Sequence, residues 1–341
     1  KYRELFQNVQ SIREERNIHM AQIKGKPTDG QLEIGRDIKT RLEKEEAAFN
    51  AVKEELDSEL LKIPNQAKDD VITLGERLDI IDIEHAAKVS GARFAYLKNE
   101  GVMLELALVQ FALDTLTPEG FTPVIPPVLI KRETMQGLGY MENGGEEDMF
   151  QTTDGMFLVG TAEQSLVPMH MDEVMDVDTF PKRYVGFSSA FRKEAGSYGK
   201  DTKGILRVHQ FDKVEMVSFV KVGQDDAEHE YLLSIEEKLF QALKIPYQVI
   251  KMCTGDLGFP AARKYDIEAW IPTQEKYREV TSVSTVTDFQ SRRLNIKYQE
   301  GNEKRYVYIL NGTAFAIGRT LIAILENFQQ EDGSVMIPEV L

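Results

Sequence analysis

The chain reads Gly186-Phe187-Ser188-Ser189-Ala190-Phe191-Arg192-Lys193-Glu194-Ala195-Gly196 over residues 186–196 and His209-Gln210-Phe211-Asp212-Lys213-Val214-Glu215-Met216 over residues 209–216. Residues 197–204 between them are rich in glycine and lysine, so we expect a strand, a long loop and a second strand. Because side chains two residues apart share one face of a strand, Arg192 and Glu194 should point one way and Lys193 the other. On the second strand, Phe211 and Glu215 should likewise share a face.

An arginine, two carboxylates and an aromatic ring on one face of a sheet can bind a nucleotide. Arginine holds a phosphate through two parallel hydrogen bonds, and an aromatic ring can stack on a base. A solvated strand face held together by ion pairs accounts for the same charges. The residues of this pair of strands leave both interpretations open.

Further β-rich segments lie around this pair, and turns rather than helices separate several of them. They cover residues 121–130, 184–191, 211–220, 265–271, 277–286 and 305–310, and residues 101–116 are a clear helical stretch. Strands that follow one another through turns favour an antiparallel sheet in an α+β domain over a doubly wound parallel sheet.

Residues 1 to about 63 have a helical period instead. Apolar residues follow steps of three, four and seven, at Leu5, Val9 and Ile12 and again at Ile34, Ile38, Leu42, Phe49, Val52, Leu56 and Leu60. Glycine and proline in residues 24–30 must reverse the chain, so we expect a long antiparallel helical hairpin over residues 1–64. A stripe this narrow predicts a protruding arm, with an oligomerisation coiled coil as the alternative. We expect Pro64 to end the second helix and residues 65–341 to form the second domain.

Length and composition place limits on the function. The 341 residues suggest about two domains, and 42% hydrophobic with 28% charged residues is typical of a globular chain. The net charge of −15 argues against a surface covered in nucleic-acid-binding charge, but a basic surface on one appendage remains compatible with an RNA partner.

The single cysteine, Cys253, excludes a disulfide framework and a multi-thiolate site, and the five histidines show no metal-ligand spacing. We therefore expect no zinc and a reducing, cytoplasmic location.

No apolar run approaches the roughly 18 residues of a membrane span, and the N-terminus lacks the apolar core of a signal peptide. The chain begins without methionine, so we expect its natural start to lie upstream. Walker, Gly-x-Gly-x-x-Gly and Gly-x-Ser-x-Gly motifs are missing, which counts against the commonest NTPases, dinucleotide enzymes and hydrolases.

A second polar cluster, Arg278-Glu279-Val280-Thr281-Ser282, offers carboxylate and hydroxyl oxygens. Magnesium prefers such ligands and usually shares them with substrate phosphates. In a regular strand Glu279 and Ser282 would face opposite sides, so contact with one ion requires a bulge or the end of the strand there. An edge strand with ordinary polar residues is the alternative.

A third cluster, Asn311-Gly312-Thr313 through Gly318-Arg319-Thr320, runs from a strand into an apolar helix. Burial of Arg319 among apolar residues without a partner is strongly unfavourable, so this arginine should meet a carboxylate or an anionic ligand. A structural salt bridge is the alternative to a ligand. The tripeptide Thr161-Ala162-Glu163 adds a hydroxyl and a carboxylate beside a turn, and this signal alone is weak.

These segments, in this order after a helical hairpin, resemble the seryl-tRNA synthetases of the bacterial and organellar type, a family of class II aminoacyl-tRNA synthetases. Residues 191–216 resemble the family's motif 2, residues 311–320 its motif 3, residues 121–127 its dimer-forming motif 1, residues 161–163 its serine loop and residues 13–17 its tRNA-binding arm. The resemblance spans essentially the whole chain, and five ordered matches are far more specific than any single one.

The resemblance implies a class II catalytic domain, an antiparallel sheet surrounded by helices, that follows a helical tRNA-binding arm. It implies ATP-dependent activation of L-serine to seryl-adenylate and transfer of serine to tRNA(Ser) by a homodimer that uses Mg²⁺. Two other functions remain open. One is aminoacyl transfer to a carrier protein, as in homologues that lack the arm, and the other is an inactive paralogue that serves as an RNA-binding interaction module.

The family's functional residues fall on positions already described. The catalytic residues would be Arg192, Glu279 and Arg319. Serine would contact Thr161, Glu163, Arg192, Glu215, Asn311 and Thr313. ATP would contact Arg192, Lys193, Glu194, Val208, Phe211, Glu279, Val280, Thr281, Ser282 and Arg319, and Mg²⁺ would be held by Glu279 and Ser282. The tRNA would contact Arg13, Arg16, Lys24, Lys26, Arg36, Lys39 and Arg41.

The chain departs from the family pattern at two places. Thr281-Ser282-Val283-Ser284-Thr285 stands where Ser-Ser-Cys-Ser-Asn is usual, and Ala314-Phe315 stands where Gly-Leu is common. We expect these changes to alter the walls of the site, and with them the selectivity for the small substrate, while its charged groups remain.

Overall fold

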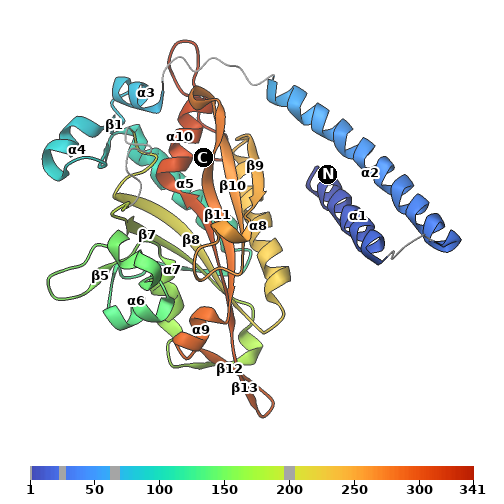
Figure 1. Ribbon diagram of the computed structural model, residues 1–341. Helices are drawn as coiled ribbons and strands as arrows, with labels where there is room; N and C mark the ends of the chain where they lie inside the picture. Colours follow the sequence, from blue (N-terminus) through green and yellow to red (C-terminus); the bar gives the residue numbers. More distant parts are fainter. Residues whose placement is uncertain (1, 23–27, 62–69, 196–203) are drawn as a thin grey trace. The chain divides into compact units, whose positions relative to one another are not determined.

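The computed structural model describes residues 2–22, 28–61, 70–195 and 204–341. The chain divides into two compact units, Lys1–Asn65 and Gln66–Leu341 (Figure 1). The predicted tRNA-binding residues Lys24 and Lys26, and most of the predicted loop over residues 197–204, lie outside the described residues. No helix in the described ranges combines the length and the apolar character that crossing a membrane requires.

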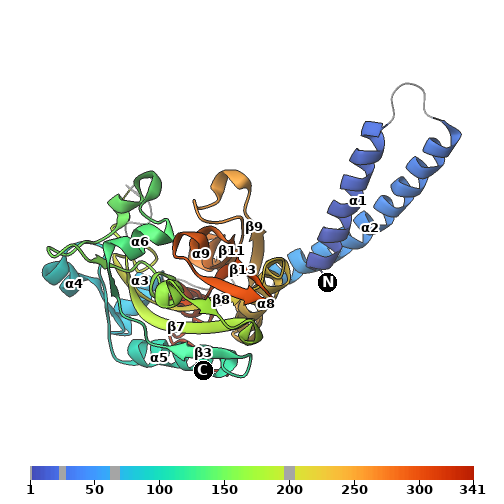
Figure 2. The same ribbon diagram turned by 90° about the horizontal axis from the view of Figure 1, so that it is seen from below.

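The first unit is the predicted helical hairpin, formed by α1 (Tyr2–Gln22) and α2 (Asp29–Leu61) (Figure 2). Its buried seam consists of Val9, Ile12, Ile38 and Leu42, with Phe49 packed against them. Ion pairs join Arg13 to Glu46 and Arg41 to Glu15, so the pairing runs backwards along α2 as an antiparallel hairpin requires. The apolar spacing predicts Ile34 in the seam, but Ile34 is 52% exposed, because the buried stripe begins one turn later.

The second unit is built on a seven-stranded sheet with the order β3-β7-β8-β14-β11-β10-β9. Its strands are β3 (Phe121–Val124), β7 (Lys182–Phe191), β8 (Gln210–Val220), β9 (Tyr247–Lys251), β10 (Arg263–Ile271), β11 (Lys276–Thr287) and β14 (Tyr308–Ala316). All neighbouring strands are antiparallel except β3 and β7, which are parallel. The predicted antiparallel sheet of an α+β domain is confirmed.

The predicted β-rich run over residues 121–130 breaks into two strands. β3 forms one edge of the large sheet, whereas β4 (Leu129–Ile130) pairs with β5 (Phe157–Leu158) in a separate small sheet. Pro126 and Pro127 lie between β3 and β4. Proline has no backbone N–H to donate to a sheet ladder. The single Pro123 is tolerated in β3 because β3 is an edge strand, whereas two successive prolines disfavour continuation of the strand.

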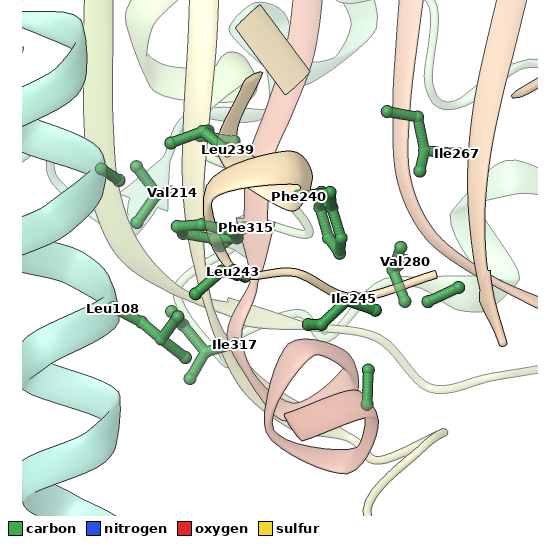
Figure 3. Packing of buried hydrophobic residues seen from close by; sticks show 14 of the residues in the cluster. Leu108, Val214, Leu239, Phe240, Leu243, Ile245, Ile267, Val280, Phe315 and Ile317 are labelled. Atoms are coloured by element: carbon green, nitrogen blue, oxygen red, sulfur yellow. The ribbon is translucent and has the colours of Figure 1, made fainter. Parts of the chain in front are cut away.

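Three helices cover one face of the large sheet: α5 (Glu100–Leu116), α8 (Asp225–Ala242) and α10 (Ile317–Asn327). Figure 3 shows the core between them, where Leu108 of α5 and Phe240 of α8 pack with Val214 and Phe315 of the sheet. Along β8, Val214 and Met216 belong to this core. The side chains that alternate with them must therefore point to the opposite face.

On that opposite face a second hydrophobic cluster covers only part of the sheet. It includes Val217 and Phe219 near the end of β8, packed under Leu166 of α7 (Glu163–Leu166). Phe211, at the other end of β8, lies outside this cluster. The start of β8 therefore has a face that neither hydrophobic cluster of the described residues covers.

Smaller elements surround this framework. They are α3 (Val71–Arg77), β1 (Ile81–Asp82), α4 (Ile83–Ser90), β2 (Tyr96–Leu97), α6 (Arg132–Leu138), β6 (Val174–Met175), α9 (Phe289–Arg293), β12 (Lys297–Glu300) and β13 (Glu303–Tyr306). Strands β6, β12 and β13 form a separate three-stranded sheet.

Candidate active site

Two adjoining cavities open on the uncovered face of the sheet. The first, here the Arg319 cavity, has a volume of about 350 Å³ and is lined by Arg319, Phe211 and Glu279 among others. The second, here the Glu163 cavity, has a volume of about 360 Å³ and includes Glu163 and Glu215 in its lining. Arg192, Lys213, Lys264 and Ser282 line both. Three cations therefore stand where the two cavities meet.

The predicted site residues of the second unit gather around these cavities with one exception. The Arg319 cavity is lined by Arg192, Glu194, Val208, Phe211, Glu279, Val280, Thr281, Ser282, Thr313 and Arg319. The Glu163 cavity is lined by Thr161, Glu163, Arg192, Glu215, Ser282 and Asn311. Lys193 lines neither cavity; it is exposed, with its Nζ 5.9 Å from the centre of the Phe150 ring.

Arg192 is held at the end of β7. Its backbone N–H donates to the carbonyl of His209 over 2.9 Å, and its Nε and Nη2 donate to the carbonyl of Gly160 over 3.2 and 3.1 Å. The ring centre of Phe211 lies 5.3 Å from its Cζ. These contacts fix the guanidinium between the two cavities.

The predicted alternation of Arg192, Lys193 and Glu194 holds for a different reason than a regular strand. β7 ends at Phe191, and Glu194 has a φ of 54°, which lies outside the range of strands. The turn nevertheless directs Arg192 and Glu194 into the Arg319 cavity, where Glu194 forms an ion pair with Arg207.

A bulge brings Glu279 and Ser282 to the same cavity. Ile267 of β10 pairs with Thr281, but the next residue, Glu268, pairs with Glu279, so Val280 is an extra residue on β11. An extra residue reverses the alternation of side chains on one side of the bulge. The bulge that joint contact with one ion would require is therefore present.

Arg319 meets a carboxylate, as its apolar surroundings predict. Its Nη1 donates to the carbonyl of Glu279 over 2.9 Å and lies 3.2 Å from the carboxylate Oε2 of the same residue. Burial raises the pKa of Glu279, but the attraction of Arg319 and Lys264 outweighs it, and the pKa lies below the usual value. Glu279 is therefore ionised at neutral pH.

Two buried carboxyl groups define the Glu163 cavity. Glu163 is 3% exposed and accepts hydrogen bonds from the hydroxyl of Tyr140 over 2.9 Å and from Nε2 of Gln290 over 2.7 Å. Glu215 is 1% exposed and forms an ion pair with Lys213. Burial raises the pKa of Glu215 to about 7, although Lys213 acts in the opposite direction.

The hydroxyl groups complete this region. Thr313 donates from Oγ1 to Oε2 of Glu215 over 3.4 Å, and both residues are buried. Thr161 is buried in the lining of the Glu163 cavity, and its Oγ1 accepts the backbone N–H of Glu163 over 3.4 Å. The cavity thus combines carboxylates with hydroxyl groups, which suits a small ligand with an ammonium group and a hydroxyl.

Sequence reasoning missed four residues of the site. Lys213 had a usable signal, because it alternates with Phe211 and Glu215 on β8. Lys264 lies at the start of β10 without a comparable pattern. The partners of Glu163 are Tyr140, which follows α6, and Gln290 of α9. These two come from elements that only the tertiary fold brings together.

The departures from the family pattern are placed differently from the expectation. Four of the changed residues are buried and line neither cavity, so they do not alter the walls of the site: Val283, Thr285, Ala314 and Phe315. Only Thr281 lines a cavity, and its hydroxyl donates to Oε2 of the buried Glu236 over 2.7 Å. In the part of the chain that the structure describes, no three His, Cys, Asp or Glu side chains are grouped to bind a metal.

Comparison with known proteins agrees with this geometry. The model of the tRNA synthetase class II core domain (G, H, P, S and T) matches residues 149–328. The serine–tRNA ligase of Dictyoglomus turgidum is 41% identical over the whole chain and 88% of its own length. The chain belongs to the serine–tRNA ligase family. The resemblance inferred from the motifs is therefore confirmed.

Other members of the serine–tRNA ligase family extend the comparison. That of Acidothermus cellulolyticus is 55% identical over 80% of this chain, which spans 65% of the relative's length. The crystal structure of seryl-tRNA synthetase from Pyrococcus horikoshii complexed with ATP has a TM-score of 0.77 and 40% identity, covering 99% of this chain and 88% of that one. Cytoplasmic serine–tRNA ligase from Naegleria fowleri, in complex with AMP, has a TM-score of 0.75 and 28% identity.

Proposed function

We propose that this protein activates L-serine with ATP to form seryl-adenylate and transfers the serine to tRNA(Ser). The observation that carries the proposal is the junction of the two cavities at Arg192, Lys213 and Lys264. A seryl-adenylate has a phosphate between its nucleoside and its amino acid, and the junction supplies cations at that position. The membership of the serine–tRNA ligase family supports the same assignment.

Serine would bind in the Glu163 cavity. Its ammonium would lie near the buried carboxyl groups of Glu163 and Glu215. Its hydroxyl would point toward Thr313, which lines the adjoining Arg319 cavity and donates a hydrogen bond to Glu215. Buried polar groups that pair with a substrate hydroxyl reject an analogue without it, because they would be left unpaired. We therefore expect alanine to be a poor substrate.

ATP would bind in the Arg319 cavity, with the adenine between Phe211 and Arg319 and the α-phosphate at Arg192. The serine carboxylate attacks the α-phosphorus, a new P–O bond forms, and diphosphate leaves as the bond to its bridging oxygen breaks. No protein nucleophile is required, because positioning and cationic stabilisation of the developing charge lower the barrier.

The residues present fit a magnesium ion shared with ATP. Glu279 is ionised, Ser282 lines the same cavity, and the bulge at Val280 turns both residues toward it. Oxygen ligands of this kind, few in number and completed by phosphates and water, are typical of Mg²⁺. When bound, Mg²⁺ would neutralise charge on the phosphates of ATP.

The helical hairpin would bind the tRNA. Among the described residues, Arg16 and Arg36 are exposed and have no ion-pair partner, whereas Arg13 and Arg41 are paired with glutamates. Lys39 lies 3.7 Å from Glu43. Unpaired arginines exchange only water and counterions when they meet a phosphate, so Arg16 and Arg36 should contribute more to the binding than Arg13 and Arg41.

A homodimer would form along α5 and β3. Val102, Met103 and Leu106 are exposed on α5, and Ile125, which follows β3, is 85% exposed. β3 is also an edge strand of the large sheet. Exposed apolar patches and open edges mark surfaces that pair with another chain.

A cytoplasmic location suits tRNA charging and the exposed thiol of Cys253.

The test is serine-dependent exchange of labelled pyrophosphate into ATP in the absence of tRNA, with alanine, threonine and cysteine each assayed alongside in place of serine. Exchange with serine is expected, and Arg192→Ala should abolish it while the circular dichroism spectrum and melting temperature stay unchanged. Lys276→Ala, an exposed charge outside both cavities, serves as the control. Absence of exchange from the folded protein, or normal exchange by Arg192→Ala, would refute the proposal.

A further inference from the structure

An exposed aromatic ring stands beside the Glu163 cavity. The turn from Gly258 to Ala261 is closed by a 2.9 Å hydrogen bond from the N–H of Ala261 to the carbonyl of Gly258. Gly258, Pro260 and Ala261 line the cavity, but Phe259 does not. Phe259 is 54% exposed, more than any other aromatic side chain in the described part of the chain.

A fixed second ring supports Phe259. The centres of Phe259 and Phe289 lie 5.4 Å apart at an interplanar angle of 88°, so the contact is edge to face. Arg292 and Arg293 each place their Cζ 5.1 Å from the centre of the Phe289 ring. Phe289 also packs against Gly139, where any Cβ would overlap its ring. Phe289 is thus held on several sides, while much of Phe259 remains open to solvent.

The charges around this pair favour contact with a base over contact with a phosphate. Arg292 pairs with Asp288 over 2.6 Å, and Arg293 pairs with Glu142 over 2.7 Å. Both guanidinium charges are therefore already neutralised. A free aromatic face with arginine planes nearby is the arrangement that stacks an unpaired base, and it does so with little dependence on base identity.

The chemistry of the proposed function supplies the occupant. Transfer requires a hydroxyl at the end of an RNA strand to attack the carbonyl carbon of seryl-adenylate, forming an ester and releasing AMP. That carbonyl would lie where the Glu163 cavity meets Arg192, and Gly258, Pro260 and Ala261 form one wall of this cavity. An RNA end that reaches it would pass close to Phe259.

We propose that Phe259, supported by Phe289, is a stacking platform for the terminal unpaired base of the RNA strand that accepts the serine. The inference rests on the proposed function and adds to it the position where the acceptor end is held. Phe259 acts by positioning the RNA end and takes no part in the activation of serine.

The experiment compares the full chain with Phe259→Leu, which keeps an apolar side chain, and Phe259→Tyr, which keeps the aromatic face. Dissociation constants are measured for tRNA(Ser) and for the same tRNA without its 3′-terminal nucleotide. Removal of this nucleotide should weaken binding to the wild type about ten-fold, in line with the stacking of one base. The same removal should hardly change the dissociation constant of Phe259→Leu, whereas Phe259→Tyr should lose affinity as the wild type does.

A fluorescent adenine analogue at the 3′ end gives a second readout, because stacking on a ring quenches its emission. Quenching by the wild type and Phe259→Tyr but not by Phe259→Leu is expected. Tyr96→Leu, at another exposed ring, is the control and should quench normally. Equal weakening of both tRNAs by Phe259→Leu, or undiminished quenching by this variant, would overturn the platform.

Pyrophosphate exchange separates this inference from the proposed function. Phe259 lines neither cavity, so Phe259→Leu should exchange at the wild-type rate and lose about ten-fold in single-turnover transfer to tRNA. If the wild type itself shows no exchange, the proposed function is wrong. If exchange is normal and transfer by Phe259→Leu is also normal, only the platform is wrong.

Discussion

The guanidinium of Arg319 donates a hydrogen bond to the carbonyl of Glu279 and lies 3.2 Å from the carboxylate of the same residue. One side chain of α10 thereby holds both the backbone and the side chain of β11 beside its bulge. The Arg319 cavity depends on this contact, because Arg319 and Glu279 both line it. The affinity for a ligand that contacts one of these residues should therefore fall when the other is replaced.

Arg319→Ala should therefore damage ATP use more than serine use. We expect kcat/KM for ATP to fall by about 100-fold or more, because a preorganised cation is removed and Glu279 is left without its partner. Arg319→Lys should recover only part of the loss, since lysine keeps the charge but lacks the planar guanidinium that would stack on the adenine. Steady-state exchange kinetics at varied ATP provide the measurement, and an unchanged KM and kcat in Arg319→Ala would contradict the assignment.

Serine binding should depend on pH through Glu215. Its pKa is raised to about 7 by burial, so below pH 7 the group is mostly protonated and offers no charge to the serine ammonium. The KM for serine should fall as the pH rises from 6 to 8, because the carboxylate forms in this range. Glu215→Gln should weaken serine binding and flatten this dependence. A wild-type KM that is constant between pH 6 and 8 would rule out Glu215 as the group that binds the ammonium.

The arm predicts a difference between paired and unpaired arginines. The double variant Arg16→Ala with Arg36→Ala should reduce the slope of log K against log salt by about one to two for tRNA(Ser). Arg13→Ala with Arg41→Ala removes the same formal charge, but these arginines are engaged with Glu46 and Glu15, so the slope should change less. Filter binding at several salt concentrations checks both, and an equal effect of the two pairs would refute the distinction.

Gly139 should be intolerant of any side chain. Its φ of 84° is left-handed, and a Cβ would overlap the ring of Phe289. We expect Gly139→Ala to lower the free energy of unfolding by more than the roughly 1–2 kcal/mol that left-handed backbone alone costs. Gly223→Ala, with a φ of 81° and open space around the added carbon, is the matched control. Chemical denaturation should show the larger loss for Gly139→Ala, and equal losses would show that Phe289 is not fixed there.

Much of the fold could be predicted because the deciding signals are local. The hairpin follows from the spacing of Val9, Ile12, Ile38 and Leu42, and the sheet follows from strand-rich runs joined by turns. The predicted β-rich run over residues 121–130 contains two strands, β3 and β4, with Pro126 and Pro127 between them. The missing N–H groups of these two prolines are a local signal that divides the run in the sequence itself.

The site was predictable where its residues sit in motifs and was missed where partners come from distant elements. The alternation along β8 gave Phe211 and Glu215, and Lys213 obeys the same alternation. Tyr140 and Gln290 carry no such pattern, because their roles arise from contact with Glu163 across the fold. Contacts between residues so far apart in the sequence depend on tertiary packing, and the spacing of residues along the chain does not reveal them.

The extra residue at Val280 decides which side chains of β11 face the cavities and which face the core. Upstream of it Glu279 faces the Arg319 cavity, and downstream Ser282 and Ser284 line the Glu163 cavity while Val283 is buried in the core. Deleting Val280 would remove no charged or polar side chain, yet it would reverse the alternation in one half of the strand. Either Glu279 or the two serines would then face the core. The length of this strand is thus as much a determinant of the site as the identity of its side chains.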